Sequence, residues 1–549
     1  MKKSSNFKKY KKLISYIGDY KYRRIFVTVL SATATIIGII IPFLLGNLVN
    51  KVQSGQSLEN IIKFSLIVAS VGLLNVFLNS LQNYKWHVFK VEFTDYFRSL
   101  MLEKFFTKKT EYCKTNFKNL SSLILQDTEN ISKDISVGLP MLFLNTLNIS
   151  MVLFFMFRMS WKLTLVVLFV IPTFTIFFGL IQNSIQNSSI KEREEFANLT
   201  DNIKEYTEGI FQIKVFKKEN FFLNKFKENI KIYEKYLKKM KWYTAVGYGI
   251  MNFTIIMLPI IILILGAIEV NNGNLTLGYL FSFYFYLNFI YEPMQNLINW
   301  FSNIQISLGM SDRIISFLEE DIEDFSKGEK ISGINEIEMK NLAFSYGEKE
   351  VLKNVNCYFK KGDIVGIIGS SGTGKSTMID VILKFWSNYS GNLLINGKEI
   401  RDISRDSYYD YVSYLEQSMF LFKGNLEENI TFNNINNKNL ENSINLARVD
   451  KIMTNKNTKG LSIESNGKNI SGGEKQRIAL ARSLYKKSDL LILDEFTSAL
   501  DNETENEVVK NIKMISKEKI ILIITHKKTP LSICNKIMDL NKNEFKTID

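Results

Sequence analysis

The sequence is poor in the residues that build disulfide frameworks and metal centres. Its 549 residues include three cysteines, Cys113, Cys357 and Cys534, and two histidines. The cysteines lie far apart and form no CxxC pair, so the pattern excludes a disulfide framework and a zinc site of the usual spacing. Reduced thiols of this kind are typical of segments that face the cytosol.

Acidic charge is also in the minority, because 55 Asp and Glu residues oppose 69 Lys and Arg residues and leave a net charge of +14. Nine of the basic residues fall among the first 24, directly before a long apolar run. That position favours a cytoplasmic N-terminus beside a membrane and argues against a nucleic-acid partner. The apolar run is longer than the core of a signal peptide, so no cleavable signal is predicted.

Long apolar runs without charge dominate the first 300 residues. About 20 residues suffice for a helix to cross the hydrocarbon core of a bilayer. Runs of at least that length occupy residues 25–50, 64–84, 135–157, 163–190, 242–268 and 271–291. Backbone groups need internal partners in lipid, and these runs are too long and too continuous for barrel strands. The sequence therefore predicts six transmembrane helices.

The connecting loops alternate in length and charge. Residues 51–63, 158–162 and 269–270 are short and carry few basic residues, whereas 85–134 and 191–241 are long and rich in lysine. The positive-inside rule places the long loops and both termini in the cytoplasm. We expect a multi-pass protein of the plasma membrane, in contact with the lipid bilayer.

A phosphate-binding loop follows a short apolar strand at 363–368. Its glycines let backbone amides turn toward phosphates, and the helix that follows offers its positive N-terminus. Lys375 is expected to reach the β- and γ-phosphates of ATP, and the Ser376 hydroxyl to bind Mg²⁺. The loop consists of Gly369, Ser370, Ser371, Gly372, Thr373, Gly374, Lys375, Ser376 and Thr377.

A second apolar segment, 490–495, ends in two acidic residues. Its uninterrupted Leu and Ile residues fit a buried parallel strand. Asp494 would hold Mg²⁺, and Glu495 would act as general base on the attacking water or polarise it. Together with the phosphate loop, this strand predicts nucleotide hydrolysis.

Further motifs resemble the ATP-binding cassette (ABC) family. Ser471, Gly472 and Gly473 open a helix with two bare glycine amides, and Ser498, Ala499, Leu500 and Asp501 follow the acidic strand. The resemblance implies that the first segment binds the γ-phosphate held by another subunit, and that the second crosses the dimer. It also implies that Tyr346 stacks on adenine, that Gln417 links Mg²⁺ to the membrane domain, and that His526 contacts the γ-phosphate.

One residue departs from the family pattern, because Glu474 stands where the family usually has glutamine. A carboxylate at that point would weaken nucleotide closure if it faced the phosphate. Ser471 and Glu474 also have the spacing of a capping box, in which the glutamate turns back onto its own helix. We favour capping.

Segments outside the ATP-site motifs give less specific indications of function. Residues 116–123 and 208–216 resemble the coupling elements of ABC exporters. Phe281, Phe285 and Phe289 share a helical face in the sixth run, where they either line a substrate path or pack against helices and lipid. Asn145 and Asn148 in the third run are expected to face the protein interior, because polar groups avoid lipid.

The predicted protein is multidomain, with an all-α six-helix transmembrane domain followed by an α/β P-loop ATPase domain. The expected parts are a basic segment 1–24, a transmembrane domain 25–315, a linker 316–335 and an ABC ATP-binding domain 336–549. The resemblance implies an ATPase that exports a peptide, lipid-like or small hydrophobic substrate by alternating access with a second half-transporter subunit. A homodimer is favoured over a heterodimer. An importer on the same fold and a membrane regulator or channel module without net pumping are the alternatives.

Overall fold

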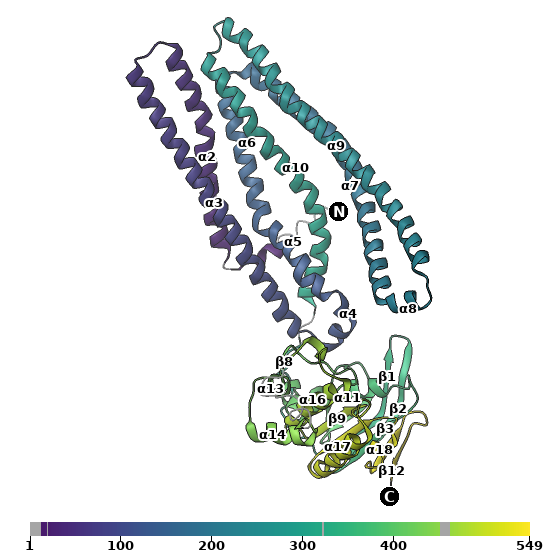
Figure 1. Cartoon of the computed structure of the whole chain (residues 1–549). Coiled ribbons are helices and arrows are strands. Elements are labelled where there is room, and N and C mark those ends of the chain that lie inside the picture. The colour runs from purple at the N-terminus through teal and green to yellow at the C-terminus, as the bar shows by residue number, and fades with distance from the viewer. Residues whose placement is uncertain (1–11, 19, 321–322, 451–461, 549) are drawn as a thin grey trace. The chain divides into compact units, whose positions relative to one another are not determined.

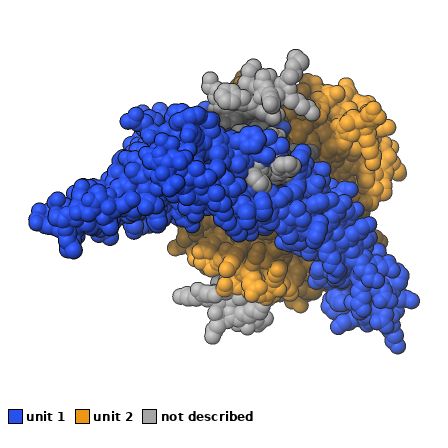
Figure 2. All heavy atoms as spheres, turned by 90° about the horizontal axis from the view of Figure 1, so that it is seen from above, with its two compact units in different colours: residues 1–102, 119–319 blue, residues 103–118, 320–549 orange. Residues whose placement is uncertain are grey.

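The computed structural model describes residues 12–18, 20–320, 323–450 and 462–548 (Figure 1). The chain forms two compact units, which Figure 2 shows in different colours. Unit 1 comprises residues 1–102 and 119–319, and unit 2 comprises residues 103–118 and 320–549. The short segment 103–118 therefore belongs with the C-terminal unit, although it is flanked in sequence by helices of unit 1.

The helical region consists of long and short helices joined by short connections. In chain order they are α2 (Tyr20–Gln53), α3 (Leu58–Phe106), α4 (Thr110–Ser122), α5 (Thr128–Lys133), α6 (Leu139–Met159), α7 (Trp161–Glu208), α8 (Ile210–Val215), α9 (Glu219–Asn271) and α10 (Leu277–Glu319). The long helices α7 and α9 run side by side, and α8 connects them (Figure 1). Five of the six predicted apolar runs fall in helical segments, and the sixth, 271–291, is helical from Leu277 onward. The last connection lies at residues 272–276, not at the predicted 269–270, because α9 continues past Glu269.

Four helical stretches in the described residues are long and apolar enough to cross a membrane: Tyr20–Gln53, Leu58–Phe106, Leu120–Met159 and Glu219–Asn271. The remaining two predicted runs lie in α7 and α10, and both helices include side chains outside the described set. In α7 the apolar stretch that is described is shorter, Trp161–Thr173.

Small residues allow α2 and α10 to approach closely inside unit 1. A Cβ on Gly278 would lie 2.0 Å from the Gly46 carbonyl oxygen, so no larger side chain fits without a shift of the helices. Asn50 Oδ1 accepts a hydrogen bond from the Gly278 N–H at 2.9 Å, and Ser282 Oγ donates to the Pro42 carbonyl at 2.8 Å. Close approach with polar cross-links is how helices associate where no hydrophobic force distinguishes a neighbour from lipid.

Two π-helical turns lie before and at the start of the third apolar run, η1 (Leu123–Asp127) and η2 (Asp134–Gly138). Such turns are rare and follow from one extra residue in a helical turn. Asp127 is buried and pairs with Arg313 of α10 at 2.9 Å. Asn145 on α6 is buried, as predicted, and in the described structure its Nδ2 has no hydrogen-bond partner.

Unit 2 contains two main sheets. The antiparallel sheet has the order β2-β1-β4-β5, and the larger sheet has the order β12-β11-β3-β10-β9-β6. The first is built from β1 (Glu336–Tyr346), β2 (Lys349–Lys360), β4 (Ser390–Ile395) and β5 (Lys398–Glu399). The second is built from β3 (Ile364–Ile368), β6 (Val412–Leu415), β9 (Leu490–Asp494), β10 (Ile520–Ile524), β11 (Lys536–Asp539) and β12 (Glu544–Thr547). Strands β11, β3, β10, β9 and β6 are parallel, and β12 is antiparallel to β11.

The helices of unit 2 connect these strands. They are α11 (Lys375–Ile382), α12 (Arg405–Asp410), α13 (Leu426–Thr431), α14 (Asn437–Leu446), α16 (Gly472–Tyr485), α17 (Asn502–Ile515) and α18 (Lys528–Leu531), with 3-10 turns η3 (Ile400–Asp402), η4 (Ser465–Gly467) and η5 (Ser516–Glu518). A short ribbon pairs β7 (Gly424–Asn425) with β8 (Ser462–Ile463).

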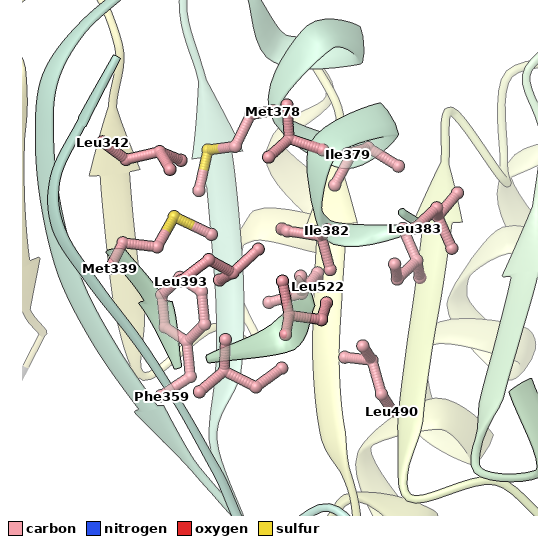
Figure 3. Packing of buried hydrophobic residues seen from close by; sticks show 14 of the residues in the cluster. Met339, Leu342, Phe359, Met378, Ile379, Ile382, Leu383, Leu393, Leu490 and Leu522 are labelled. Carbon is pink, nitrogen blue, oxygen red and sulfur yellow. The ribbon is translucent and has the colours of Figure 1, made fainter. Parts of the chain in front are cut away.

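Side chains of the central strands alternate between two hydrophobic cores. Leu490 and Leu522 enter the core that also holds Met339, Phe359 and Met378, between the two sheets and α11 (Figure 3). Their neighbours Leu491, Leu493, Ile521 and Ile523 enter the other core with α16 and α17. Period-two alternation with apolar residues on both faces gives the uninterrupted apolar strands that the sequence displays. The predicted α/β architecture is confirmed.

Candidate functional site

Four functional segments meet at one edge of the parallel sheet. Strands β3, β10, β9 and β6 are neighbours in that order, with Ile367 beside Ile524, Ile524 beside Asp494, and Leu493 beside Leu415. The carboxyl ends of parallel strands lie at the same edge. The chain leaves these four strands into the phosphate loop, His526, Glu495 and Gln417 respectively. The topology therefore aligns residues that are up to 157 positions apart in sequence, and this edge is where open α/β sheets bind ligands.

The phosphate loop has the backbone conformation that its glycines permit. Gly372 and Gly374 have φ angles of +85° and +95°, a region that other residues rarely adopt. A Cβ at Gly374 would also lie 2.8 Å from Leu352 Cδ2. Thr373 Oγ1 donates to the Ser370 carbonyl at 2.9 Å, and Ser370 Oγ donates to Asn541 Oδ1 at 2.8 Å. The loop is thus held by a hydrogen bond within it and by one to the turn that follows β11.

The lysine of the loop lies over its own backbone. Lys375 begins α11, and its Nζ donates to the carbonyl oxygens of Gly369 at 2.6 Å and Ser370 at 3.0 Å. Its positive charge is therefore centred beside the amides that precede the helix. A helix N-terminus together with an ammonium group is a strong anion site. Ser376 and Thr377 follow in the first turn, where Ser376 is exposed and Thr377 is buried.

The two acidic residues after β9 differ in environment. Asp494 is buried at the end of the strand. Burial raises the pKa of its carboxyl to about 6, and the negative charge of the adjacent Glu495 acts in the same direction. The positive charge of Lys375 opposes this increase. Glu495 has a left-handed φ of +48°, and its N–H donates to the Ile524 carbonyl at 2.9 Å. Its carboxylate accepts a hydrogen bond from Gln417 Nε2 at 3.0 Å. The predicted general base and the predicted glutamine are therefore in direct contact.

The described residues contain no group of three or more His, Cys, Asp and Glu side chains that could hold a metal ion. Mg²⁺ that is bound mainly through phosphate oxygens requires only one or two protein ligands. The Ser376 hydroxyl, the Asp494 carboxylate and the Gln417 amide oxygen are hard oxygen donors of the type that Mg²⁺ prefers. The residues present fit this ion.

Three aromatic residues cluster near the end of β1. Tyr346 is exposed and makes edge contacts with Phe344 and Trp386, whose ring centroids lie 4.8 and 5.2 Å from its own. Trp386, just after α11, is buried and was not singled out from the sequence. The stacking of Tyr346 on adenine remains a prediction. His526 is exposed directly after β10.

Ser471, Gly472 and Gly473 lie elsewhere, at the N-terminus of α16. Ser471 Oγ accepts from the Glu474 N–H at 3.3 Å, and Glu474 Oε2 accepts from the Ser471 N–H at 2.8 Å and from Ser471 Oγ at 2.9 Å. This reciprocal pattern is a capping box, as expected from the spacing. The carboxylate that departs from the family pattern is thereby turned onto its own helix.

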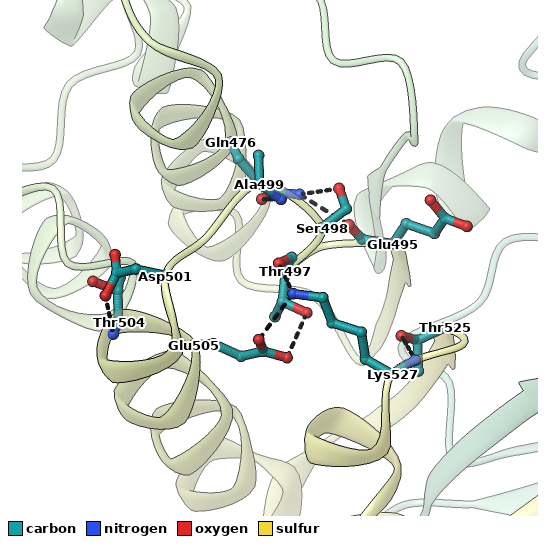
Figure 4. A network of polar contacts seen from close by, with 10 residues as sticks. All are labelled: Gln476, Glu495, Thr497, Ser498, Ala499, Asp501, Thr504, Glu505, Thr525 and Lys527. Atoms are coloured by element: carbon teal, nitrogen blue, oxygen red, sulfur yellow. Dashed lines mark hydrogen bonds and ion pairs between the residues drawn. The ribbon is translucent and has the colours of Figure 1, made fainter.

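A polar network under the site was missed from the sequence (Figure 4). Glu505 of α17 is buried, accepts a hydrogen bond from Thr497 Oγ1 at 3.1 Å, and pairs with Lys527 Nζ at 2.9 Å. Lys527 Nζ also donates to the Thr497 carbonyl at 2.8 Å. The pair joins the segment after β9 to the residue that follows His526. Glu505 and Lys527 are 22 positions apart on different elements, so no local sequence pattern predicts their contact.

Residues 107–114 also contact the α/β part of unit 2. Lys114 Nζ lies 2.6 Å from an Asp380 carboxylate oxygen of α11, the helix that follows the phosphate loop. Arg405, which is buried, donates to Thr110 Oγ1 and to Glu323. A cavity of about 1010 Å³ adjoins this contact. These contacts precede the predicted coupling segment 116–123, of which the side chains at 116–119 lie outside the described residues.

Comparison with known proteins agrees with this arrangement. Residues 25–294 match the family model of the ABC transporter transmembrane region, and residues 352–498 match that of the ABC transporter. The putative multidrug export ATP-binding/permease protein YgaD of Bacillus subtilis is 27% identical over 96% of this chain and 94% of its own length. The ATP-dependent lipid A-core flippase of Syntrophus aciditrophicus is 28% identical over 78% of this chain and 72% of its own. ABC transporter B family member 1 of Dictyostelium discoideum is 26% identical over 92% of this chain, which spans 56% of the length of that protein.

Proposed function

The chain belongs to the ABC transporters, and we propose that two copies of it form an exporter of apolar or amphipathic compounds. A transmembrane region and an ATP-hydrolysing domain are fused in the chain, as in the half-transporters of the exporter type. It is a multi-pass membrane protein that carries out ATP-driven export. The observation that carries the proposal is the alignment of the phosphate loop, His526, Glu495 and Gln417 along one sheet edge in a chain that also holds the helical unit.

Each aligned residue has a distinct proposed role in ATP hydrolysis. Lys375 and the loop amides bind the β- and γ-phosphates, and Ser376, Asp494 and Gln417 would hold Mg²⁺, which would neutralise phosphate charge. Glu495 takes a proton from the attacking water, and its contact with Gln417 orients its carboxylate. His526 contacts the γ-phosphate, and Tyr346 stacks on adenine. The left-handed backbone at Glu495 supports a functional role, because such strain is concentrated at active sites.

The proposed dimer has two composite ATP sites. Ser471, Gly472 and Gly473 of one copy would close on ATP held by the phosphate loop of the second copy, since a helix N-terminus attracts anions. ATP would draw the cassettes together, segment 107–114 and α8 would transmit the closure, and hydrolysis would reset the cycle. The substrate class is proposed from the named activities of the relatives, multidrug export and lipid A-core flipping.

Complementation between two inactive variants tests the composite site. Lys375→Ala removes phosphate binding, and Gly472→Asp places a negative charge at the α16 N-terminus. A Cβ at Gly472 would meet Ala499 Cβ at 3.7 Å, an ordinary van der Waals contact, so the backbone there leaves room for a side chain to begin. We expect each variant alone to lose ATPase activity in liposomes with Mg²⁺, and co-expressed variants to regain it. Only the mixed dimer holds one intact site, so equal inactivity of the mixture would contradict the dimer.

A further inference from the structure

Gln476 on the second turn of α16 has a side chain that is completely buried, with 0% of the residue exposed. A buried primary amide is costly unless its donors and its acceptor have partners. Gln476 lies five positions after Ser471 on the same helix, so the polar group is rigidly connected to the segment proposed to close on ATP. The identity of its partners therefore matters.

Within the part of the chain that the structure describes, the partners of this amide belong to the segment that follows β9 (Figure 4). Nε2 donates to the Glu495 carbonyl oxygen at 2.9 Å and to Ser498 Oγ at 3.2 Å. Oε1 accepts from the Ala499 N–H at 2.9 Å. A carbonyl can only accept and an amide N–H can only donate, so these partners fix the orientation of the Gln476 amide.

Close packing at the start of α16 supports the same connection. A Cβ on Gly473 would lie 2.9 Å from the Ala499 carbonyl oxygen, which only a shift of one segment would relieve. The N-terminus of α16 and residues 495–499 are thus joined by two independent features, a hydrogen-bonded amide and a glycine contact. Movement of one segment requires movement of the other.

The backbone of Glu495 needs such support. Its φ of +48° is unfavourable for a residue with a side chain and persists only where neighbours hold it. The Glu495 N–H donates a hydrogen bond to the Ile524 carbonyl at 2.9 Å, and the Glu495 carbonyl accepts one from Gln476 Nε2. The side chain of Glu495 extends away from this network in Figure 4, toward Gln417. Gln476 therefore acts on the backbone and leaves the carboxylate to the reaction.

We propose that Gln476 is a positioning residue for Glu495, and that it ties the base of one ATP site to the helix that closes the other. The proposal rests on the proposed function, in which α16 serves the ATP of the second copy while Glu495 serves the ATP of its own. Closure at one site is then transmitted through one side chain to the carboxylate at its neighbour. This link is separate from nucleotide binding, which depends on Lys375 and the loop amides.

The test compares turnover with binding in the full-length protein in liposomes. Gln476→Leu removes all three hydrogen bonds, and Gln476→Glu keeps an acceptor for Ala499 but loses both donors. We expect kcat to fall at least tenfold in Gln476→Leu and less in Gln476→Glu. KM for ATP and Kd for a fluorescent ATP analogue should change less than threefold. In the Glu495→Gln background, where no base remains to be positioned, Gln476→Leu should alter ATP retention less than threefold.

Asn429 provides a matched control, because its amide is also buried, bonds backbone groups at Phe422 and Asn425, and accepts a hydrogen bond from Arg482 Nη2 at 3.1 Å. Asn429→Leu should lower the melting temperature but leave kcat within threefold of wild type. The role of Gln476 is overturned if Gln476→Leu retains kcat, if Asn429→Leu loses kcat equally, or if binding weakens in parallel. A wild-type chain without ATPase activity would overturn the proposed function as well.

Discussion

At the scale of single residues, Glu495 is held by three different neighbours and carries the proposed chemistry. Glu495→Gln should reduce ATP turnover at least about 100-fold, the usual contribution of a general base. ATP should remain bound, because Lys375 and the loop amides are unchanged. Phosphate release and retention of labelled ATP on gel filtration measure the two effects. Glu518→Gln, in η5, is the control, and hydrolysis at a near-wild-type rate in Glu495→Gln would exclude Glu495 as the base.

Glu474 is the residue at which the chain departs from its family, and the capping box explains how the carboxylate is accommodated. Glu474→Gln should leave ATPase activity unchanged or raise it, because glutamine also offers an oxygen to the Ser471 N–H. Stability should change by less than about 1 kcal/mol, the typical cost of losing a cap. Turnover assays and unfolding of the solubilised chain check both points. A fall in turnover of more than about tenfold, about 1.4 kcal/mol of barrier, would show that the carboxylate has a positive catalytic role.

At the scale of elements, the Glu505–Lys527 pair links α17 to the segment that follows β10. Lys527→Met would leave the Glu505 carboxylate buried without its cation, which should destabilise the fold. We expect a loss of about 2–3 kcal/mol in the free energy of unfolding, a moderate value because Lys527 is itself partly exposed. The double variant with Glu505→Gln should recover at least half of this loss, since no buried charge remains. Urea unfolding of the solubilised chain measures both.

Lys546→Met, at the exposed pair with Glu544, serves as the control for the buried pair. Its unfolding midpoint should equal that of the wild type, because exposed pairs are solvated with or without their partner. If the double variant is no more stable than Lys527→Met, the buried charge is not the source of the loss.

The elements were largely predictable from the sequence because their signals are local. The charge-free runs fall in helices except at 272–276, and the apolar strands before Gly369, Glu495 and His526 lie in one parallel sheet. Neither the contact of Lys114 with Asp380 nor that of Gln476 with Glu495 was predicted. The two residues of these pairs are 266 and 19 positions apart in the sequence, and neither pair produces a periodic sequence pattern. The π-helical turns at 123–127 and 134–138 were also missed, since helical periodicity does not reveal one inserted residue.

At the scale of the whole molecule, the proposed orientation places both termini in the cytoplasm. The nine basic residues before the first span should remain inside, and the turn that contains Gly55 should face outward. In a background where Cys113, Cys357 and Cys534 are replaced by serine, an impermeant thiol reagent on intact cells should label a cysteine at Gly55. It should not label one at Ser4. The reverse labelling pattern would invert the topology.

The most direct test of the account is transport into sealed inside-out vesicles that contain the wild-type chain. ATP with Mg²⁺ should drive uptake of an apolar cationic dye, because the ATP sites face the outside of such vesicles and export becomes uptake. Vesicles with Glu495→Gln should show none. ATP hydrolysis that moves none of a panel of apolar and lipid-like probes, or that drives them out of the vesicles, would contradict an exporter.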